Sequence, residues 1–83
     1  MSLKKSTAIL LVSGKSSSSI ADEFAKALKE FSVEVSDSQE ILMSGRVILA
    51  IEFHFDPAHL NAIEDELGEL ARAKSLDLAA EVL

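Results

Sequence analysis

The residues with the clearest chemical potential lie near the start of the chain. Ser13-Gly14-Lys15-Ser16 matches the last positions of a phosphate-binding loop, but the complete motif needs a glycine five residues before Gly14, where this chain has Ile9. What remains is a glycine followed by backbone amides that run into a helix, a natural seat for a carboxylate or another small anion. The alternative is a plain connection between a strand and a helix.

A second polar group consists of Glu52, His54, Asp56 and His59. Two imidazoles with carboxylates can hold a transition metal. Their spacing matches no strong metal-binding motif, and Asp56 is better explained as the cap of the helix that Pro57 begins. We therefore predict a solvated rim here and no metal site.

Catalytic chemistry finds little support in the sequence. Small βαββαβ enzymes of the acylphosphatase type use an Arg in the first strand–helix loop and an Asn on the second strand. Here the loop has Lys15, Arg46 lies elsewhere, and Asn61 falls in a predicted helix. The chain has no cysteine, and no serine has a suitable His and Asp pairing. We predict that this segment is not an enzyme, has no catalytic residues and needs no cofactor.

Composition limits the classes of partner. The chain has 83 residues, 48% of them apolar, which suits one folded domain. Its formal net charge of -6 argues against nucleic acid or an anionic membrane as partner, since both attract basic surfaces. The longest apolar run, residues 8–12, is too short for a signal segment or a membrane span, so we expect a cytoplasmic protein.

The periodicity of apolar residues predicts six elements. Strands are expected at residues 6–13, 33–44, 46–55 and 76–82, with helices at 19–31 and 57–74. This order is βαββαβ, an α+β ferredoxin-like fold with a four-stranded antiparallel sheet and two helices on one face. We assign residues 6–83 to this single domain and residues 1–5 to an N-terminal tail.

The second strand has an unusual pattern. Alternate residues of this strand, counted from Val33, are apolar at both ends and polar in the middle. The apolar ones are Val33, Val35, Ile41 and Met43, and Asp37 and Gln39 lie between them. Such a strand is predicted to bend or bulge near Asp37. Ser44-Gly45 then predicts a two-residue hairpin turn.

The alternation also predicts a second apolar surface. In the two central strands, one set of alternate residues is expected to pack on the helices. The other set, which includes Ile9, Leu11, Ile48 and Ala50, then faces away from them. An apolar patch on an open sheet is typical of a partner surface, which favours a dimer through the sheet, sheet to sheet or edge to edge, or docking onto another domain. The alternative is that scattered apolar residues have no partner.

With this order of elements, the sequence is similar to the N-terminal ACT domain of bacterial phosphoserine phosphatase. The similarity covers about residues 6–82 and is carried by Leu11-Val12-Ser13-Gly14, by the run from Val33 to Arg46, and by Leu76-Asp77-Leu78. The run from Val33 is the most specific part, since it follows that family's pattern GVEV-x-D-x-EQ-x-x-x-x-GR.

The resemblance implies a regulatory domain that binds a small amino acid such as serine, forms a homodimer and tunes an attached enzyme. That enzyme would be a C-terminal phosphatase domain, which hydrolyses phosphoserine in the last step of serine synthesis and is absent from these residues. The resemblance implies that Gly14, Ser16 and Ser19 hold the ligand's carboxylate. Asp37 and Gln39 would hold its ammonium group and side chain.

The ligand loop departs from the family's pattern, which reads SG-x-DxPG. Here Ser16 stands at the Asp position, Ser18 at the Pro position and Ser19 at the second Gly position. Ser16 lacks the charge that would pair with an ammonium group, and a side chain at Ser19 narrows the approach to the backbone. The alternative hypothesis is therefore a ferredoxin-like dimerisation or docking module with a degenerate ligand site.

Overall fold

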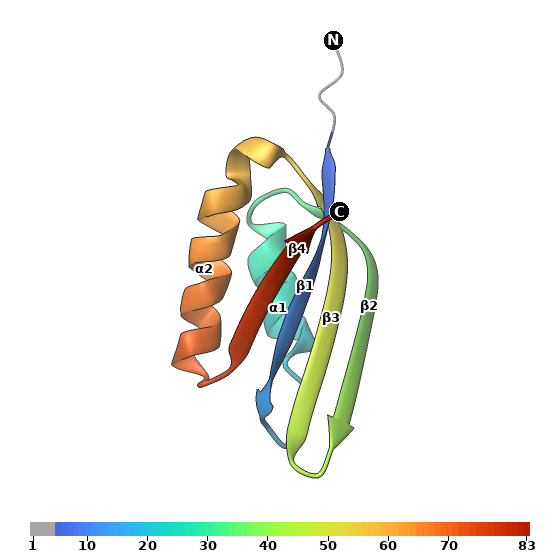
Figure 1. Cartoon of the computed structure of the whole chain (residues 1–83), viewed down its shortest axis with the longest axis vertical. Coiled ribbons are helices and arrows are strands. Elements are labelled where there is room, and N and C mark those ends of the chain that lie inside the picture. Colours follow the sequence, from blue (N-terminus) through green and yellow to red (C-terminus); the bar gives the residue numbers. More distant parts are fainter. Residues whose placement is uncertain (1–4) are drawn as a thin grey trace.

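The computed structural model describes residues 5–83, which form a four-stranded sheet with both helices on one side of it (Figure 1). The strands are antiparallel, in the order β2-β3-β1-β4. In chain order the elements are β1 (Ser6–Lys15), α1 (Ala21–Lys29), β2 (Glu34–Met43), β3 (Arg46–Phe55), the short 3-10 helix η1 (Pro57–His59), α2 (Leu60–Ala73) and β4 (Asp77–Val82). The predicted ferredoxin-like α+β fold is confirmed. Of the predicted tail at residues 1–5, residues 1–4 lie outside the described part of the chain.

Several element ends differ from the predicted ones by one to three residues. β1 continues beyond Ser13 because its ladder with β3 extends to the pair formed by Lys15 and Arg46. α1 ends at Lys29, before the predicted end at Phe31, because the chain there leaves the helix through tight three-residue hydrogen bonds. The longer β1 matters for function, because it turns the first half of the predicted anion loop into strand.

The core lies between the helices and one face of the two central strands. Alternate residues of β1 and β3 are buried, as are the apolar stripes of both helices, which confirms the predicted periodicities. The buried residues are Ala8, Leu10 and Val12 of β1, Val47, Leu49, Ile51, Phe53 and Phe55 of β3, Phe24 and Leu28 of α1, and Ile63, Leu67 and Ala71 of α2. Each fully buried aromatic or aliphatic side chain contributes about 1.5–3 kcal/mol to this packing.

The edge strand β2 contains the predicted bulge. Its register with β3 shifts between Val35 and Asp37, so that an extra residue, Ser36, is accommodated there. The bulge reverses the parity of the rest of the strand. Val35 pairs with Phe53 on the helix side, whereas Ile41 is on the open side. The prediction that these two residues share a face was therefore wrong, because a bulge flips every later side chain.

The connections before and after β3 are each determined by residues that are close in sequence. Ser44 and Gly45 form the hairpin turn with φ angles of 53° and 71°, the two positive values that a tight two-residue turn needs. After β3, the side chain of Asp56 accepts a hydrogen bond of 2.9 Å from the amide of Ala58. The predicted cap is confirmed, although Asp56 caps the start of η1, and α2 follows directly after η1.

The C-terminal end of α2 closes with two hydrogen bonds typical of a Schellman motif. The amide of Ser75 donates to the carbonyl of Arg72 at 3.0 Å, and the amide of Leu76 donates to that of Ala71 at 2.8 Å. Ser75 adopts a φ of 56°, a left-handed conformation that a residue with a Cβ atom enters at a cost. Leu76 is buried against the core directly afterwards, which fixes where β4 begins.

We predict that Ser75→Gly stabilises the domain by about 1 kcal/mol, because glycine adopts the left-handed conformation without steric cost. Urea unfolding followed by circular dichroism measures this. The matched control is Ala73→Gly, two residues earlier, at the last residue of α2. There glycine should destabilise the domain by about 0.5–1 kcal/mol, because the residue has a helical conformation. Equal loss of stability in both variants would contradict the assigned role of Ser75.

Candidate functional site

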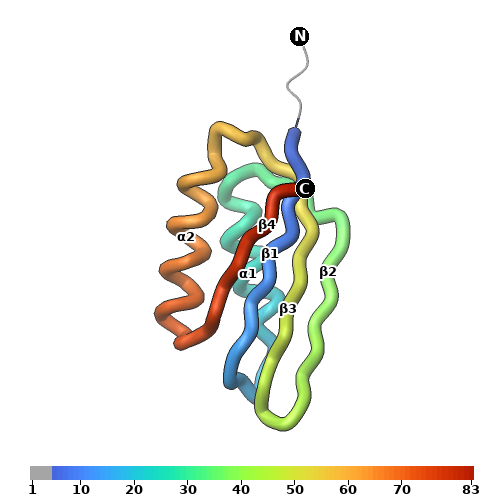
Figure 2. The backbone as a smooth tube through the Cα atoms, in the orientation of Figure 1, coloured from blue at the N-terminus to red at the C-terminus, as the bar shows by residue number. Residues whose placement is uncertain are grey.

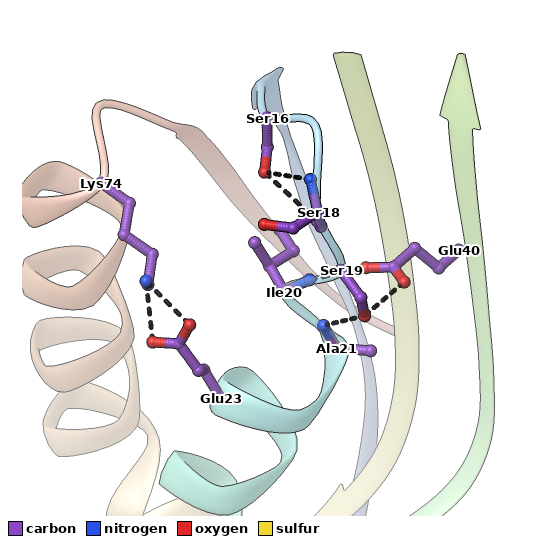
Figure 3. A network of polar contacts seen from close by, with 8 residues as sticks. All are labelled: Ser16, Ser18, Ser19, Ile20, Ala21, Glu23, Glu40 and Lys74. Atoms are coloured by element: carbon purple, nitrogen blue, oxygen red, sulfur yellow. Dashed lines mark hydrogen bonds and ion pairs between the residues drawn. The ribbon is translucent and has the colours of Figure 1, made fainter. Parts of the chain in front are cut away.

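The connection from β1 to α1 spans residues 16–20 and is held by its own serine side chains. Its first amide, that of Ser16, donates to the carbonyl of Gly45 at 3.0 Å, which attaches the loop to the hairpin turn. The hydroxyl of Ser16 donates to the carbonyl of Ser18 at 2.8 Å and accepts from its amide at 3.3 Å (Figure 3). Ser16, a predicted ligand residue, therefore orders the loop in this structure.

Gly14 is buried within β1 next to the start of β4. A Cβ atom at this position would lie 2.7 Å from Cδ2 of Leu76 and 3.4 Å from its Cα. A side chain here would therefore have to push a core leucine and its backbone apart. The glycine serves the close approach between β1 and the chain that follows α2, whatever further role its neighbouring amides have.

The N-terminal end of α1 already holds a carboxylate, which belongs to Glu40 of β2. The hydroxyl of Ser19 donates to Oε1 of Glu40 at 2.7 Å, and the amide of Ile20 donates to Oε2 at 2.9 Å (Figure 3). Ser19 also accepts from the amide of Ala21 at 3.3 Å. Ile20 is the N-cap position of α1, and Glu40 supplies a negative charge at this helix end.

These contacts set the ionisation of Glu40. Partial burial raises the pKa of its carboxyl group, but the hydrogen bonds from the Ser19 hydroxyl and from the amides of Ile20 and Ala21 outweigh this and lower the pKa below its ordinary value. Glu40 is therefore an anion at neutral pH. The loop and the helix end together bind the carboxylate of Glu40.

The other two predicted ligand residues lie elsewhere. Asp37 pairs with Glu52 and Gln39 with Ala50 on the face of the sheet that points away from the helices. Together with Ile9 they border a shallow hollow of about 250 Å³. Since successive residues of a strand point to opposite faces, Gln39 and Glu40 serve different sides. The structure thus brings Ser16 and Ser19 near one another but separates them from Asp37 and Gln39.

Sequence analysis did not identify Glu40 as a functional residue. The residue pairs with Leu49, a buried residue of β3, so it lies on the helix side of the sheet. The sequence nevertheless contains a signal for this role of Glu40. An acidic residue at a core-facing position of an edge strand needs a donor, and the nearest helix end offers free amides. The bulge had to be placed correctly before that parity became visible.

Comparison with known families decides the classification. The sequence pattern of the ACT domain matches residues 6–81. The chain belongs to the ACT-domain family. ACT domains are regulatory modules, and the regulatory part of the prediction from sequence is confirmed. A search among curated proteins gives no match.

Solved structures agree with the fold of this ACT domain. A protein assigned as a glycine cleavage system transcriptional repressor superposes with a TM-score of 0.85 at 14% identity, over 95% of this chain and 46% of its own. Formyltetrahydrofolate deformylase from Burkholderia mallei gives 0.82 at 17%, over 92% and 28%. An ACT domain protein from Streptococcus pneumoniae gives 0.78 at 14%, over 93% and 89%. This ACT domain thus spans less than half of the first two chains.

The polar residues considered for a metal site are engaged separately in this ACT domain. The hydroxyl of Ser36 donates to Glu52 at 2.8 Å, and Thr7 Oγ1 lies 2.8 Å from Nδ1 of His54. Asp56 caps η1. Within residues 5–83, no three histidine or carboxylate side chains gather in a way that could hold a metal ion. In the same range, no helix is long and apolar enough to cross a membrane.

We predict that Glu40→Gln destabilises this ACT domain by about 1 kcal/mol at pH 7, because the helix end loses its anion. A carboxyl group whose pKa is lowered by folding stabilises above its unfolded pKa, and this contribution disappears as pH falls through the folded pKa. The difference between wild type and variant should therefore shrink as pH falls below the ordinary pKa of a glutamate, about 4.3, and vanish once pH lies below the lowered pKa of the folded state. Urea unfolding across this range measures it.

The control is Glu64→Gln on the exposed side of α2, which removes the same charge far from the loop. It should change stability by less than about 0.5 kcal/mol at any pH. A pH-independent loss in the Glu40→Gln variant would mean that its carboxylate is not what holds the start of α1.

Proposed function

We propose that this ACT domain is a regulatory module that binds a small amino acid such as serine at the loop between β1 and α1. The observation that carries the proposal is the carboxylate of Glu40 seated on Ser19 and Ile20. This contact supports the proposal because the loop and the helix end already hold one carboxylate, and it adds a negative charge near the amides that follow Gly14.

Both ends of an amino acid find complementary groups here. Its carboxylate would take the amides and hydroxyls of the loop, including Ser16 and Ser19, in line with the prediction from sequence. Its ammonium group would pair with Glu40, whose oxygens keep free lone pairs. We assign this role to Glu40 in place of Asp37 and Gln39, because the latter two face away from the loop.

We further propose that the attached enzyme is a phosphoserine phosphatase of the cytoplasm, and that two copies pair through the sheet. The choice of enzyme rests on the similarity of the run from Val33 to Arg46 to that family. The partial coverage of the first two structural matches suits a module joined to further domains. Feedback by serine would then link the end product of the pathway to the enzyme that makes it.

Titration of isotope-labelled protein with L-serine tests the binding site. We expect saturable shifts of the backbone amide signals of residues 14–20 and of Glu40 as serine reaches millimolar concentration. Glu40→Gln should weaken the affinity about tenfold through loss of a charged partner, whereas Asp37→Asn should leave it unchanged. Serinol, which lacks the carboxylate, is the control ligand and should cause no saturable shift.

The second candidate function is an assembly module whose ligand site is degenerate. It is favoured by the occupied helix end, since Glu40 itself fills the position that a ligand's carboxylate would take. Flat signals for serine and for a panel of other amino acids, in a protein that still self-associates, would support this candidate and refute the first.

A further inference from the structure

The open face of the sheet carries a set of exposed apolar side chains, and both helices lie on the other side of the sheet (Figure 2). We call this set the apolar patch: Leu11 of β1, Ile41 and Met43 of β2, and Ile48 of β3, with exposed fractions of 45%, 51%, 68% and 52%. The prediction that Leu11 and Ile48 face away from the helices is confirmed. Their neighbours Ile9 and Ala50 are half-buried on the same face.

The patch contains a hollow of about 370 Å³ next to the hairpin turn between β2 and β3. Apolar side chains form most of its lining, and Ser13 and Arg46 are its polar side chains. The full lining is Ser13, Gly14, Ile41, Met43, Arg46, Val47 and Ile48. Sites for small organic molecules usually enclose about 300–1,000 Å³ and combine an apolar wall with a few polar groups. This hollow has both properties.

The charged group of the hollow is a cation without an internal partner. Arg46 is exposed and lies opposite Lys15 in the ladder between β1 and β3. Within residues 5–83, the one ion pair joins Lys74 to Glu23, so the guanidinium of Arg46 takes part in none. Its planar group of N–H donors matches the two oxygens of a carboxylate.

An acidic residue, Asp77, also lies at this end of the open face. It is exposed on β4 and pairs with Ser13 of β1. Because β1 lies between β4 and β3, the backbones of Asp77 and Arg46 are about 10–12 Å apart, more than the screening length at physiological salt. Asp77 is closer to Lys15 and offsets its charge. Arg46 is therefore the cation that remains for a ligand.

A second hollow on the same face has the opposite charge. Asp37 and Glu52 line it together with Gln39, and its volume is about 250 Å³. Two carboxylates repel an anion, whereas the hollow beside Arg46 attracts one. The open face therefore distinguishes its two hollows by charge.

We propose that the hollow beside Arg46 binds a small amphipathic carboxylate, that is, a carboxylate with a short hydrocarbon chain. The guanidinium of Arg46 would donate two hydrogen bonds to the carboxylate oxygens. The chain would lie along β3 against Ile41 and Ile48, since residues two apart on one face of a strand are separated by about 6.8 Å. Octanoate has both parts and serves as the probe.

An amino acid fits this hollow less well than an unsubstituted carboxylate. Among the described residues that line the hollow, none is acidic, so an ammonium group would have no charged partner there. The proposed serine site has such a partner in Glu40, which lies on the helix side of β2. The present proposal therefore needs neither serine binding nor the pairing of two copies.

Titration with octanoate tests the hollow. We expect saturable shifts of the methyl signals of Ile41, Met43 and Ile48 in isotope-labelled protein at millimolar concentration. Hexanoate should bind more weakly, by up to about fourfold for each methylene removed, because less apolar surface is buried. Flat signals with octanoate would overturn the proposal. Equal affinity for 1-octanol would also overturn it, since the carboxylate would then have no role.

Removal of the guanidinium tests the anion contact. Arg46→Gln should weaken octanoate binding about tenfold and leave the weak affinity for 1-octanol unchanged, because a hydrogen bond between charged groups is lost. The matched control is Arg72→Gln, which removes the same group from an exposed position of α2 on the other side of the sheet. Equal affinity for octanoate in the two variants would contradict the assigned role of Arg46.

Two neighbouring residues of β2 test the apolar contact. Ile41 and Leu42 have similar exposed fractions, 51% and 49%, but point to opposite faces of the sheet. Ile41→Ser should weaken octanoate binding about fivefold, whereas Leu42→Ser should leave it unchanged. Circular dichroism checks that both variants fold. Equal effects of the two substitutions would place the chain of the ligand outside the hollow and refute the proposal.

Serine titration of the Arg46→Gln variant separates this inference from the function proposed above. If both proposals hold, the variant loses octanoate binding but keeps the serine shifts at residues 14–20. A wild type that responds to octanoate and not to serine would refute the serine site alone. The reverse response would refute the present proposal alone.

Discussion

The pairing of β1 with β3 is the constraint on which the rest of this domain depends. Ten residues of each strand pair, from Ser6 with Phe55 to Lys15 with Arg46. The register decides which side chains enter the core and which stand on the open face, since the two sets alternate. A shift of β3 by one residue would turn Glu52 and His54 toward the helices in place of Phe53 and Phe55, so the buried set strongly specifies one alignment.

Glu40 extends this constraint to the edge of the sheet. β2 buries little of its own surface. The hydrogen bonds from Ser19 and Ile20 to Glu40 join the strand to the start of α1, across two segments that are about twenty residues apart in sequence. One carboxylate thereby caps the helix, orients the loop and fixes the edge strand.

Periodic signals predicted the fold well, because two helical stripes and two alternating strands each had one consistent buried face. The hairpin at Ser44-Gly45 and the cap at Asp56 were also predictable, since both depend on neighbours in sequence. The candidate site was harder to predict from the sequence than the fold. Its key pair, Ser19 with Glu40, depends on tertiary contact, and Glu40 points toward the helix only because the bulge at Ser36 reverses the parity of the residues after it. Asp37 and Gln39 entered the predicted ligand set through the resemblance to a known family, and the bulge turns both of them to the open face.

The two surfaces proposed for function meet in β2. Glu40 points toward the loop at α1, and the next residue, Ile41, stands on the open face with Met43. A ligand whose ammonium group draws on Glu40 alters one of the few contacts that position this edge strand. Any resulting shift of β2 moves Ile41 at the apolar patch, because a strand transmits displacement along its rigid backbone. A coupling of this kind requires that the ligand bind the two positions of β2 with different affinity.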